Sequence, residues 1–195
     1  SGNELYLKDL SVPNSPIVAI HKGFEYDVDV LDNIGTTLFI VTNLKAPNKR
    51  IVTVDVANPG VENWKDLIPE TDQVLNPSTG AGYIFANYMK DAVSVVKQFD
   101  YKGKLIRTIA LPGVGTASGF GGKAKDKELY FSFTNYVTPG TTYTFFPDSG
   151  KSSVYVKPKV DFVSENYESK QVFFTSKDGT KVPMIITHKK GLQLN

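Results

Sequence analysis

Short runs of β-branched and aromatic residues recur along this 195-residue chain, with turn-forming residues between them. Such runs suit a pleated, half-buried surface and predict strands. The expected strands lie at residues 26–31, 36–42, 50–56, 64–68, 73–76, 81–88, 92–99, 104–110, 116–120, 128–134, 141–146 and 152–156. Turn signals such as Asn58-Pro59-Gly60 and Pro139-Gly140 separate them. Long helical periodicity is absent, with only one helical turn expected within 61–67, so the sequence predicts an all-β fold.

The expected strands fall into groups of four that repeat about every 40–47 residues, which is the length of a propeller blade. The groups predict four-stranded antiparallel blades at about 22–69, 73–111 and 115–158. Residues 1–20 would be the remnant of an earlier blade, with Leu5 to Leu10 as its closing strand. The prediction is a partial β-propeller of about three to three and a half blades. A β-sandwich with evenly spaced strands is the alternative that the pattern leaves open.

The last thirty residues change character. Strand-like runs at 171–175 and 182–187 flank Asp178-Gly179, a pair typical of two-residue hairpin turns. Pro183 indicates an edge strand, because proline cannot donate to the ladder. Two strands cannot complete a further blade, so we expect the partial propeller over 1–163 and a hairpin segment over 164–195. The chain opens almost directly into a strand and closes without a capping helix, and we expect it to be a piece of a longer protein.

Composition excludes several classes of protein. Lys and Arg number 22 and Asp and Glu 20, a net charge of +2 without long charge runs, so no nucleic-acid partner is expected. The absence of cysteine excludes disulfides, thiolate metal sites and a cysteine nucleophile. No apolar run approaches the roughly 18 residues of a membrane span, and the first residues do not resemble a signal peptide. We expect a soluble protein without a membrane partner, in the cytoplasm or periplasm.

Few residues are candidates for chemistry. His21 and His188 are the only histidines, and neither has a metal ligand or a triad partner at motif spacing, so both are expected to be structural or solvent-facing. The glycine-rich segment 113–122 departs from the Gly-x-Gly-x-x-Gly spacing and precedes a strand, which indicates close backbone approach at a blade rather than nucleotide binding. Ser118 lacks the flanking glycines of a nucleophile elbow.

Acidic residues cluster around one expected strand. Asp27 and Asp29 share a face by the two-residue period, and Asp32 follows. Such carboxylates could serve acid–base chemistry or bind calcium, but a solvated strand face is the favoured interpretation. Trp64 is expected to be packing material, and Asn76-Pro77-Ser78 is excluded as a glycosylation site by its proline. No catalytic, cofactor-binding or metal-binding residue is assigned, and no cofactor is expected.

Several segments resemble the prolyl oligopeptidase family of serine peptidases. The segments Asn33-x-Gly35-Thr36, Thr42-Asn43-x3-Pro47-Asn48-x-Arg50 and Trp64-Lys65-Asp66-Leu67-Ile68-Pro69-Glu70 resemble its propeller, as do Glu128 to Thr134 and Thr138-Pro139-Gly140. The most specific match is Val172 to Gly191, with Ser176-Lys177-Asp178-Gly179-Thr180-Lys181-Val182-Pro183-Met184, which resembles the crossover into the peptidase domain.

The resemblance implies a seven-bladed propeller over an α/β-hydrolase domain with a Ser-Asp-His triad, in an enzyme that cleaves short peptides after proline. The triad would lie mainly beyond this chain, so no catalytic residue is carried over, and the chain itself is expected to be inactive. Its expected partners are the missing blades and hydrolase domain, short proline-containing peptides for the parent enzyme, and further copies of itself through exposed blade faces. The alternative function is an independent binding module for a protein or peptide.

Overall fold

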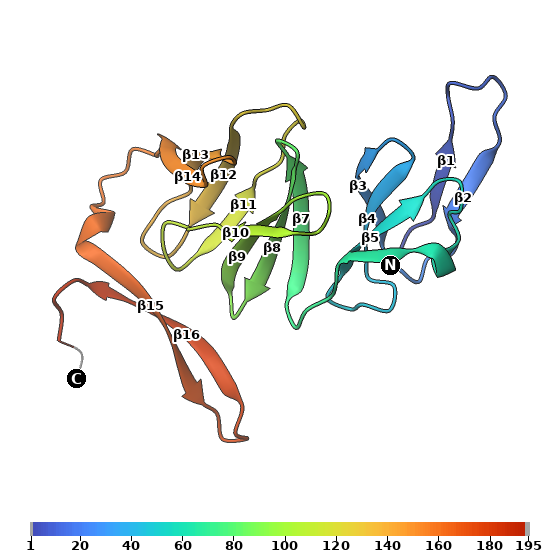
Figure 1. Cartoon of the computed structure of the whole chain (residues 1–195). Helices are drawn as coiled ribbons and strands as arrows, with labels where there is room; N and C mark the ends of the chain where they lie inside the picture. Colours follow the sequence, from blue (N-terminus) through green and yellow to red (C-terminus); the bar gives the residue numbers. More distant parts are fainter. Residues whose placement is uncertain (1, 194–195) are drawn as a thin grey trace. The chain divides into compact units, whose positions relative to one another are not determined.

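The computed structural model describes residues 2–193, whose regular structure consists almost entirely of strands joined by turns and loops (Figure 1). The strands are β1 Leu5–Lys8, β2 Ile17–His21, β3 Val28–Ile34, β4 Thr37–Thr42, β5 Arg50–Asp55, β6 Lys65–Ile68, β7 Val74–Gly80, β8 Tyr83–Lys90, β9 Val93–Phe99, β10 Leu105–Thr108, β11 Thr116–Gly119, β12 Leu129–Thr134, β13 Thr141–Phe146, β14 Lys151–Val156, β15 Tyr167–Thr175 and β16 Lys181–Lys189. Two 3-10 turns lie at Val61–Asn63 and Ser164–Asn166. The expected helical turn within 61–67 is thus confined to its first three residues.

The strands form separate four-stranded antiparallel sheets, each made of consecutive strands. The orders are β3-β4-β5-β6, β10-β9-β8-β7 and β11-β12-β13-β14, with two-stranded sheets β1-β2 and β15-β16 on either side in the sequence. This up-and-down order within each sheet is that of propeller blades, and it confirms the partial β-propeller. A sandwich would instead distribute its strands over two facing sheets, so that alternative is not supported.

The blade remnant differs from the prediction. Instead of one closing strand over 5–10, β1 ends at Lys8 and pairs with a second strand, β2. The apolar run Ile17 to Ile20, which follows Pro16 directly, was not among the expected strands. Ile20 is buried, so the run is held by packing rather than by its own pattern.

The chain divides into two compact units: residues 1–77 with 101–104, and residues 78–100 with 105–195. In the first unit, one apolar face of the sheet β3–β6 packs with β2, through Ile20, Val28, Leu38, Ile40, Val52 and Val54. The alternate residues of β4 and β5 face this core, as the two-residue period of a strand requires. On the other face of β4, the ring of Phe39 meets that of Tyr101 edge-on at 4.9 Å.

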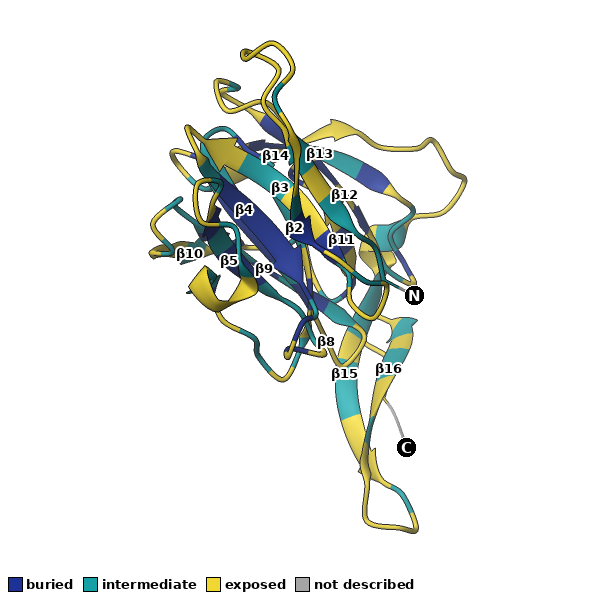
Figure 2. Ribbon diagram, turned by 90° about the vertical axis from the view of Figure 1, so that its right-hand side faces the viewer, coloured by how far each residue is buried: buried dark blue, intermediate teal, exposed yellow. Residues whose placement is uncertain are grey.

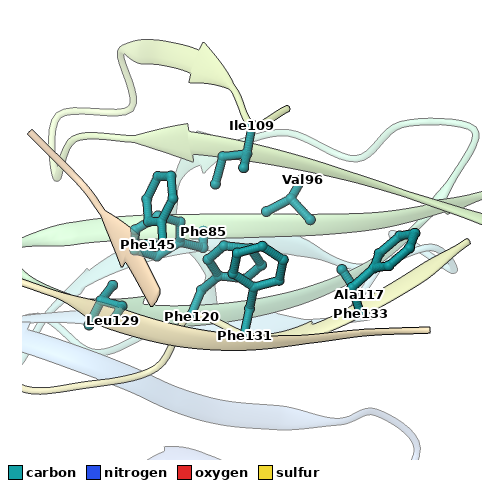
Figure 3. Packing of buried hydrophobic residues seen from close by; sticks show 9 residues of the cluster. All are labelled: Phe85, Val96, Ile109, Ala117, Phe120, Leu129, Phe131, Phe133 and Phe145. Carbon is teal, nitrogen blue, oxygen red and sulfur yellow. The ribbon is translucent and has the colours of Figure 1, made fainter. Parts of the chain in front are cut away.

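The second unit is held by an aromatic core between its two sheets (Figure 3). Its buried members are Phe85, Val96, Ile109, Ala117, Phe120, Leu129, Phe131, Phe133 and Phe145. Phe120 stacks on Phe131 at 4.6 Å and on Phe85 at 5.4 Å between ring centroids. Rings from β8, from β12 and from the residue after β11 therefore stack, and burying such large apolar surfaces fixes the two sheets against each other.

The hairpin β15–β16 is much less buried than the blades, as the colouring of Figure 2 shows. Its strands pair in continuous register from Tyr167 with Lys189 to Thr175 with Lys181. Gly179 has a φ of +85°, in agreement with the predicted turn at Asp178-Gly179. Pro183 lies in β16, whose outer edge is unpaired within the two-stranded sheet, as its proline indicated. No helix among the described residues has the length and apolar character to cross a membrane.

Candidate functional site

Several loops gather at one end of the second unit, the end where the chain leaves β14. Because successive antiparallel strands alternate in direction, the segment leading into β11, the β12–β13 loop and the exit from β14 share this end. The β8–β9 turn is adjacent, since the amide of Ser94 donates to the carbonyl of Gly115 at 2.9 Å. Loops on a rigid β scaffold are where binding residues concentrate, so this end is the candidate site.

Asn135 organises the β12–β13 loop. Its Oδ1 accepts hydrogen bonds from the amides of Val137 at 3.0 Å and Thr138 at 2.7 Å. Its Nδ2 donates to the carbonyl of Val114 at 3.0 Å, which ties the loop to the segment that leads into β11. An asparagine that bonds the backbone two and three residues on is a turn-forming device. The result is a loop of defined shape.

Tyr136 stands between the anchored Asn135 and Val137, and it is 76% exposed. A pocket of about 340 Å³ lies on one side, lined by Ala92, Gly115, Thr116, Thr134, Asn135 and Tyr136. A second hollow of about 280 Å³ adjoins the ring and reaches Val160 and Phe162 of the linker that follows β14. No residue that lines either hollow carries a charge, so the site suits a neutral ligand.

Two features of the backbone give the pocket its shape. Gly115 passes so close to β12 that a Cβ on it would lie 2.4 Å from the carbonyl oxygen of Thr134. Asp91 and Ala92 form the β8–β9 turn with φ values of +50° and +65°. This left-handed backbone conformation matches the twist of a two-residue hairpin, but it is strained for residues other than glycine. The hairpin β15–β16 attaches beside this turn, where Gln171 Nε2 donates to the carbonyl of Asp91 at 2.6 Å.

Neither histidine lines this pocket. His21 is 8% exposed at the end of β2, and its ring meets that of Tyr26 edge-on. The side chain of His188 in β16 is 8% exposed, with Nε2 3.7 Å from Glu168 Oε1 and Nδ1 3.0 Å from the carbonyl oxygen of Lys189. Both histidine rings are therefore packed into the structure, and the solvent-facing alternative does not hold.

The glycine-rich segment 113–122 contributes shape. Gly119 has a φ of +118°, and a Cβ there would lie 2.7 Å from the carbonyl oxygen of Tyr130, so the expected close approach of backbones is present. Ser118 is exposed within β11 and pairs with Ser132 in a regular ladder. A strand, β12, follows the segment, and neither a nucleophile elbow nor a phosphate loop has that geometry.

The three aspartates do not converge. Asp27 forms an ion pair with Lys49 at 3.2 Å, Asp29 is exposed, and Asp32 accepts a hydrogen bond from the hydroxyl of Tyr101. Among residues 2–193, no group of three or more histidine or acidic side chains is placed to hold a metal ion. Trp64 packs against the core of the first unit, and its Nε1 donates to the carbonyl of Pro59 at 2.9 Å, as expected of packing material.

Comparison with known proteins identifies the fold. Residues 1–158 match the family described as prolyl oligopeptidase, N-terminal β-propeller domain. The chain belongs to this family. A prolyl endopeptidase of Elizabethkingia miricola is 55% identical over 193 residues, which cover 99% of this chain and 27% of the relative. A prolyl endopeptidase of Dictyostelium discoideum is 34% identical over 78% of this chain. The chain thus spans about a quarter of the length of the curated relatives it matches.

Solved prolyl oligopeptidases have the same fold. A structure from a mechanistic study of two prolyl endopeptidases superposes with a TM-score of 0.83 at 35% identity, over 99% of this chain and 28% of that one. Prolyl oligopeptidase B from Galerina marginata superposes with a TM-score of 0.85 at 26% identity, over 97% of this chain and 28% of that one. The prolyl oligopeptidase resemblance carried by the motifs is confirmed.

The Asn135–Tyr136 loop and the Asp91–Ala92 turn were not singled out from the sequence. Asn135 precedes Tyr136-Val137-Thr138-Pro139-Gly140, of which only Thr138-Pro139-Gly140 contributed to the family resemblance. An aromatic residue beside an asparagine in such a stretch was the available signal.

Proposed function

We propose that this chain is the later part of the propeller of a prolyl oligopeptidase-type serine endopeptidase that cleaves short peptides after proline. Residues 1–163 would belong to the propeller, and residues 164–195 would form the crossover and first hairpin of the α/β-hydrolase domain. The family match supports this division, because it ends at residue 158 although the relatives align through the hairpin. The low burial of the hairpin also supports it, since it has its own sheet and few partners in this chain.

In this proposal the propeller acts as a filter for substrates. A closed ring of blades over an active site leaves a narrow chamber, which admits short flexible peptides and excludes folded proteins. Dry walls around the chamber also keep water from the reacting groups. The residues that cleave the peptide bond would lie in the hydrolase domain, outside this chain, and its partners in the enzyme would be the remaining blades and that domain.

The test compares the purified 195-residue chain with the full-length protein on a Gly-Pro chromogenic peptide. We expect turnover that a serine-directed reagent blocks in the full-length protein, and none in the 195-residue chain. Turnover by the short chain that the same reagent blocks would refute the assignment of the triad to another domain. In the parent gene, we expect a Gly-x-Ser-x-Gly motif after this segment, followed by the aspartate and histidine. An unrelated domain there would favour the independent binding module instead.

A further inference from the structure

Tyr136 is an exposed ring on a stretch of backbone whose shape is fixed. The loop that carries it is fixed on both sides of the residue by the three hydrogen bonds of Asn135. Exposing a large aromatic surface is unfavourable in water. Because the backbone of the loop is fixed, the loop cannot easily rearrange to bury the ring. A ring presented in this way is preorganised for contact with a ligand.

The surroundings of the ring limit the chemistry of that ligand. Both hollows beside Tyr136 are uncharged, and neither would compensate an ionised group brought into it. The described residues provide no hydrogen-bond partner for the hydroxyls of Thr116 and Tyr136, whereas the hydroxyl of Thr134 already donates to the carbonyl of Thr138 at 3.1 Å. The pocket therefore offers an aromatic face and two available hydroxyl donors to a neutral acceptor.

A proline-containing peptide has the complementary features. The prolyl ring is a compact apolar surface that lies flat against aromatic side chains, and proline-rich segments are recognised in aromatic-lined grooves. Since proline lacks an N–H, such a segment presents mainly carbonyl acceptors, which hydroxyl donors can satisfy.

We propose that Tyr136, with Thr116 and the pocket between them, binds a segment of the peptide substrate at a distance from the bond that is cleaved. This inference rests on the proposed function, because it takes the chain to be part of an enzyme that acts on proline-containing peptides. The position supports it: the hairpin that would begin the hydrolase domain attaches by Gln171 to Asp91, next to the pocket residue Ala92. The pocket thus lies at the end of the unit from which the chain continues toward the proposed catalytic domain.

The test uses the full-length protein and a series of peptides that share the cleaved Pro-X bond and increase in length. The effect of Tyr136→Ala on kcat/KM is expected to depend on peptide length. For longer peptides that can reach the pocket, the substitution is expected to lower kcat/KM roughly three- to tenfold, the range of a single aromatic contact. Tyr136→Phe keeps the ring and should retain most of the activity, while Thr116→Val should weaken the longer peptides in the same direction. Tyr6→Ala, at an exposed tyrosine of the first unit, serves as the control.

The outcomes separate the two proposals. If the wild-type protein cleaves none of the peptides, the proposed function is wrong and the substrate site is wrong with it. If the wild type cleaves them all and Tyr136→Ala changes every length equally, the ring supports a domain contact and the substrate site is refuted, while the proposed function stands. No change at any length refutes the site in the same way. A loss that begins at one peptide length, and that Tyr6→Ala does not show, supports it.

Discussion

At the scale of single residues, Phe120 combines an unfavourable backbone with extensive packing. Its φ is +64°, a left-handed conformation that costs roughly 1–2 kcal/mol for a residue with a Cβ. Its ring is 1% exposed and stacks between Phe85 and Phe131. The burial of the ring stabilises the second unit by more than the backbone conformation costs, so the aromatic residue is retained where glycine would be the usual choice.

Phe120→Ala is expected to lower the free energy of unfolding by about 3–5 kcal/mol, because it leaves a cavity in the core and keeps the strained φ. Phe120→Gly loses the same ring but adopts the left-handed conformation freely, so its loss should be smaller. Chemical denaturation of both variants measures the difference. An alanine variant at least as stable as the glycine variant would contradict the account of the strained backbone.

Two glycines of the segment 113–122 provide a matched pair. A Cβ on Gly115 would meet the backbone of Thr134, whereas one on Gly121 would meet nothing within 4 Å. Gly115→Ala is therefore expected to destabilise the protein by about 1–3 kcal/mol. Gly121→Ala should stay within about 0.5 kcal/mol of the wild type. Thermal unfolding of the two variants checks this, and equal midpoints would show that the close approach at Gly115 is not constrained.

At the scale of elements, the turn of the hairpin β15–β16 is held in part by a hydrogen bond to the side chain of Asp178. The amide of Ser176 donates to the carbonyl of Thr180 at 2.8 Å, and Asp178 Oδ1 accepts from the amide of Thr180 at 3.0 Å. The backbone N–H of Thr180, followed by its hydroxyl, holds the pKa of Asp178 below its usual value. A two-stranded hairpin is marginally stable, so such local bonds matter to it.

The lowered pKa of Asp178 gives a pH dependence with a defined sign. The stabilisation of the turn is complete above the unfolded pKa, which is about 3.9 for aspartate, and it is lost as the pH falls through the lower folded pKa. We expect the amide resonance of Thr180 to shift in that acidic range. Asp178→Asn keeps an acceptor oxygen and should abolish this titration while preserving the hairpin. NMR titration of both proteins measures it, and a Thr180 shift that persists in Asp178→Asn would contradict the assignment.

The elements differ in how far the sequence determines them. The run of apolar and aromatic residues in β12 predicted the strand directly, and its buried and exposed residues alternate from Leu129 to Thr134. β2 is held by contacts with residues far along the chain, and its short run was not recognisable alone. The site was harder still to predict, because the loop that carries Tyr136 is tied down by the bond from Asn135 to Val114, 21 residues away. Strand patterns record burial along an element, whereas a loop's shape depends on individual long-range bonds.

At the scale of the molecule, the sheet β11–β14 has one face in the aromatic core and an opposite face with exposed rings. Tyr130, Phe146 and Tyr155 are 40%, 39% and 61% exposed, and the rings of Tyr130 and Tyr155 contact each other at 4.9 Å. In a propeller, such a face is covered by the neighbouring blade. In the 195-residue chain it remains available for contact with another copy.

We expect the 195-residue chain to self-associate through this face. Tyr155→Glu places a charge on it and should shift the equilibrium toward monomer, because burying an unpaired carboxylate is unfavourable. Light scattering over a range of concentrations measures the effect, with Tyr136→Ala as the control for removing an exposed ring elsewhere. A strictly monomeric wild type at high concentration would contradict the expectation.

The turn between β9 and β10 makes the boundary between the two units discontinuous in sequence. Residues 101–104 belong to the first unit although the strands on either side belong to the second, and Tyr101 meets both Phe39 and Asp32 there. No single cut in the chain can therefore separate the units cleanly. A chimera that exchanges one blade between related enzymes would have to take residues 101–104 from the same parent as the preceding blade. Recombination sites placed only at the linkers between blades would separate Tyr101 from its partners Phe39 and Asp32.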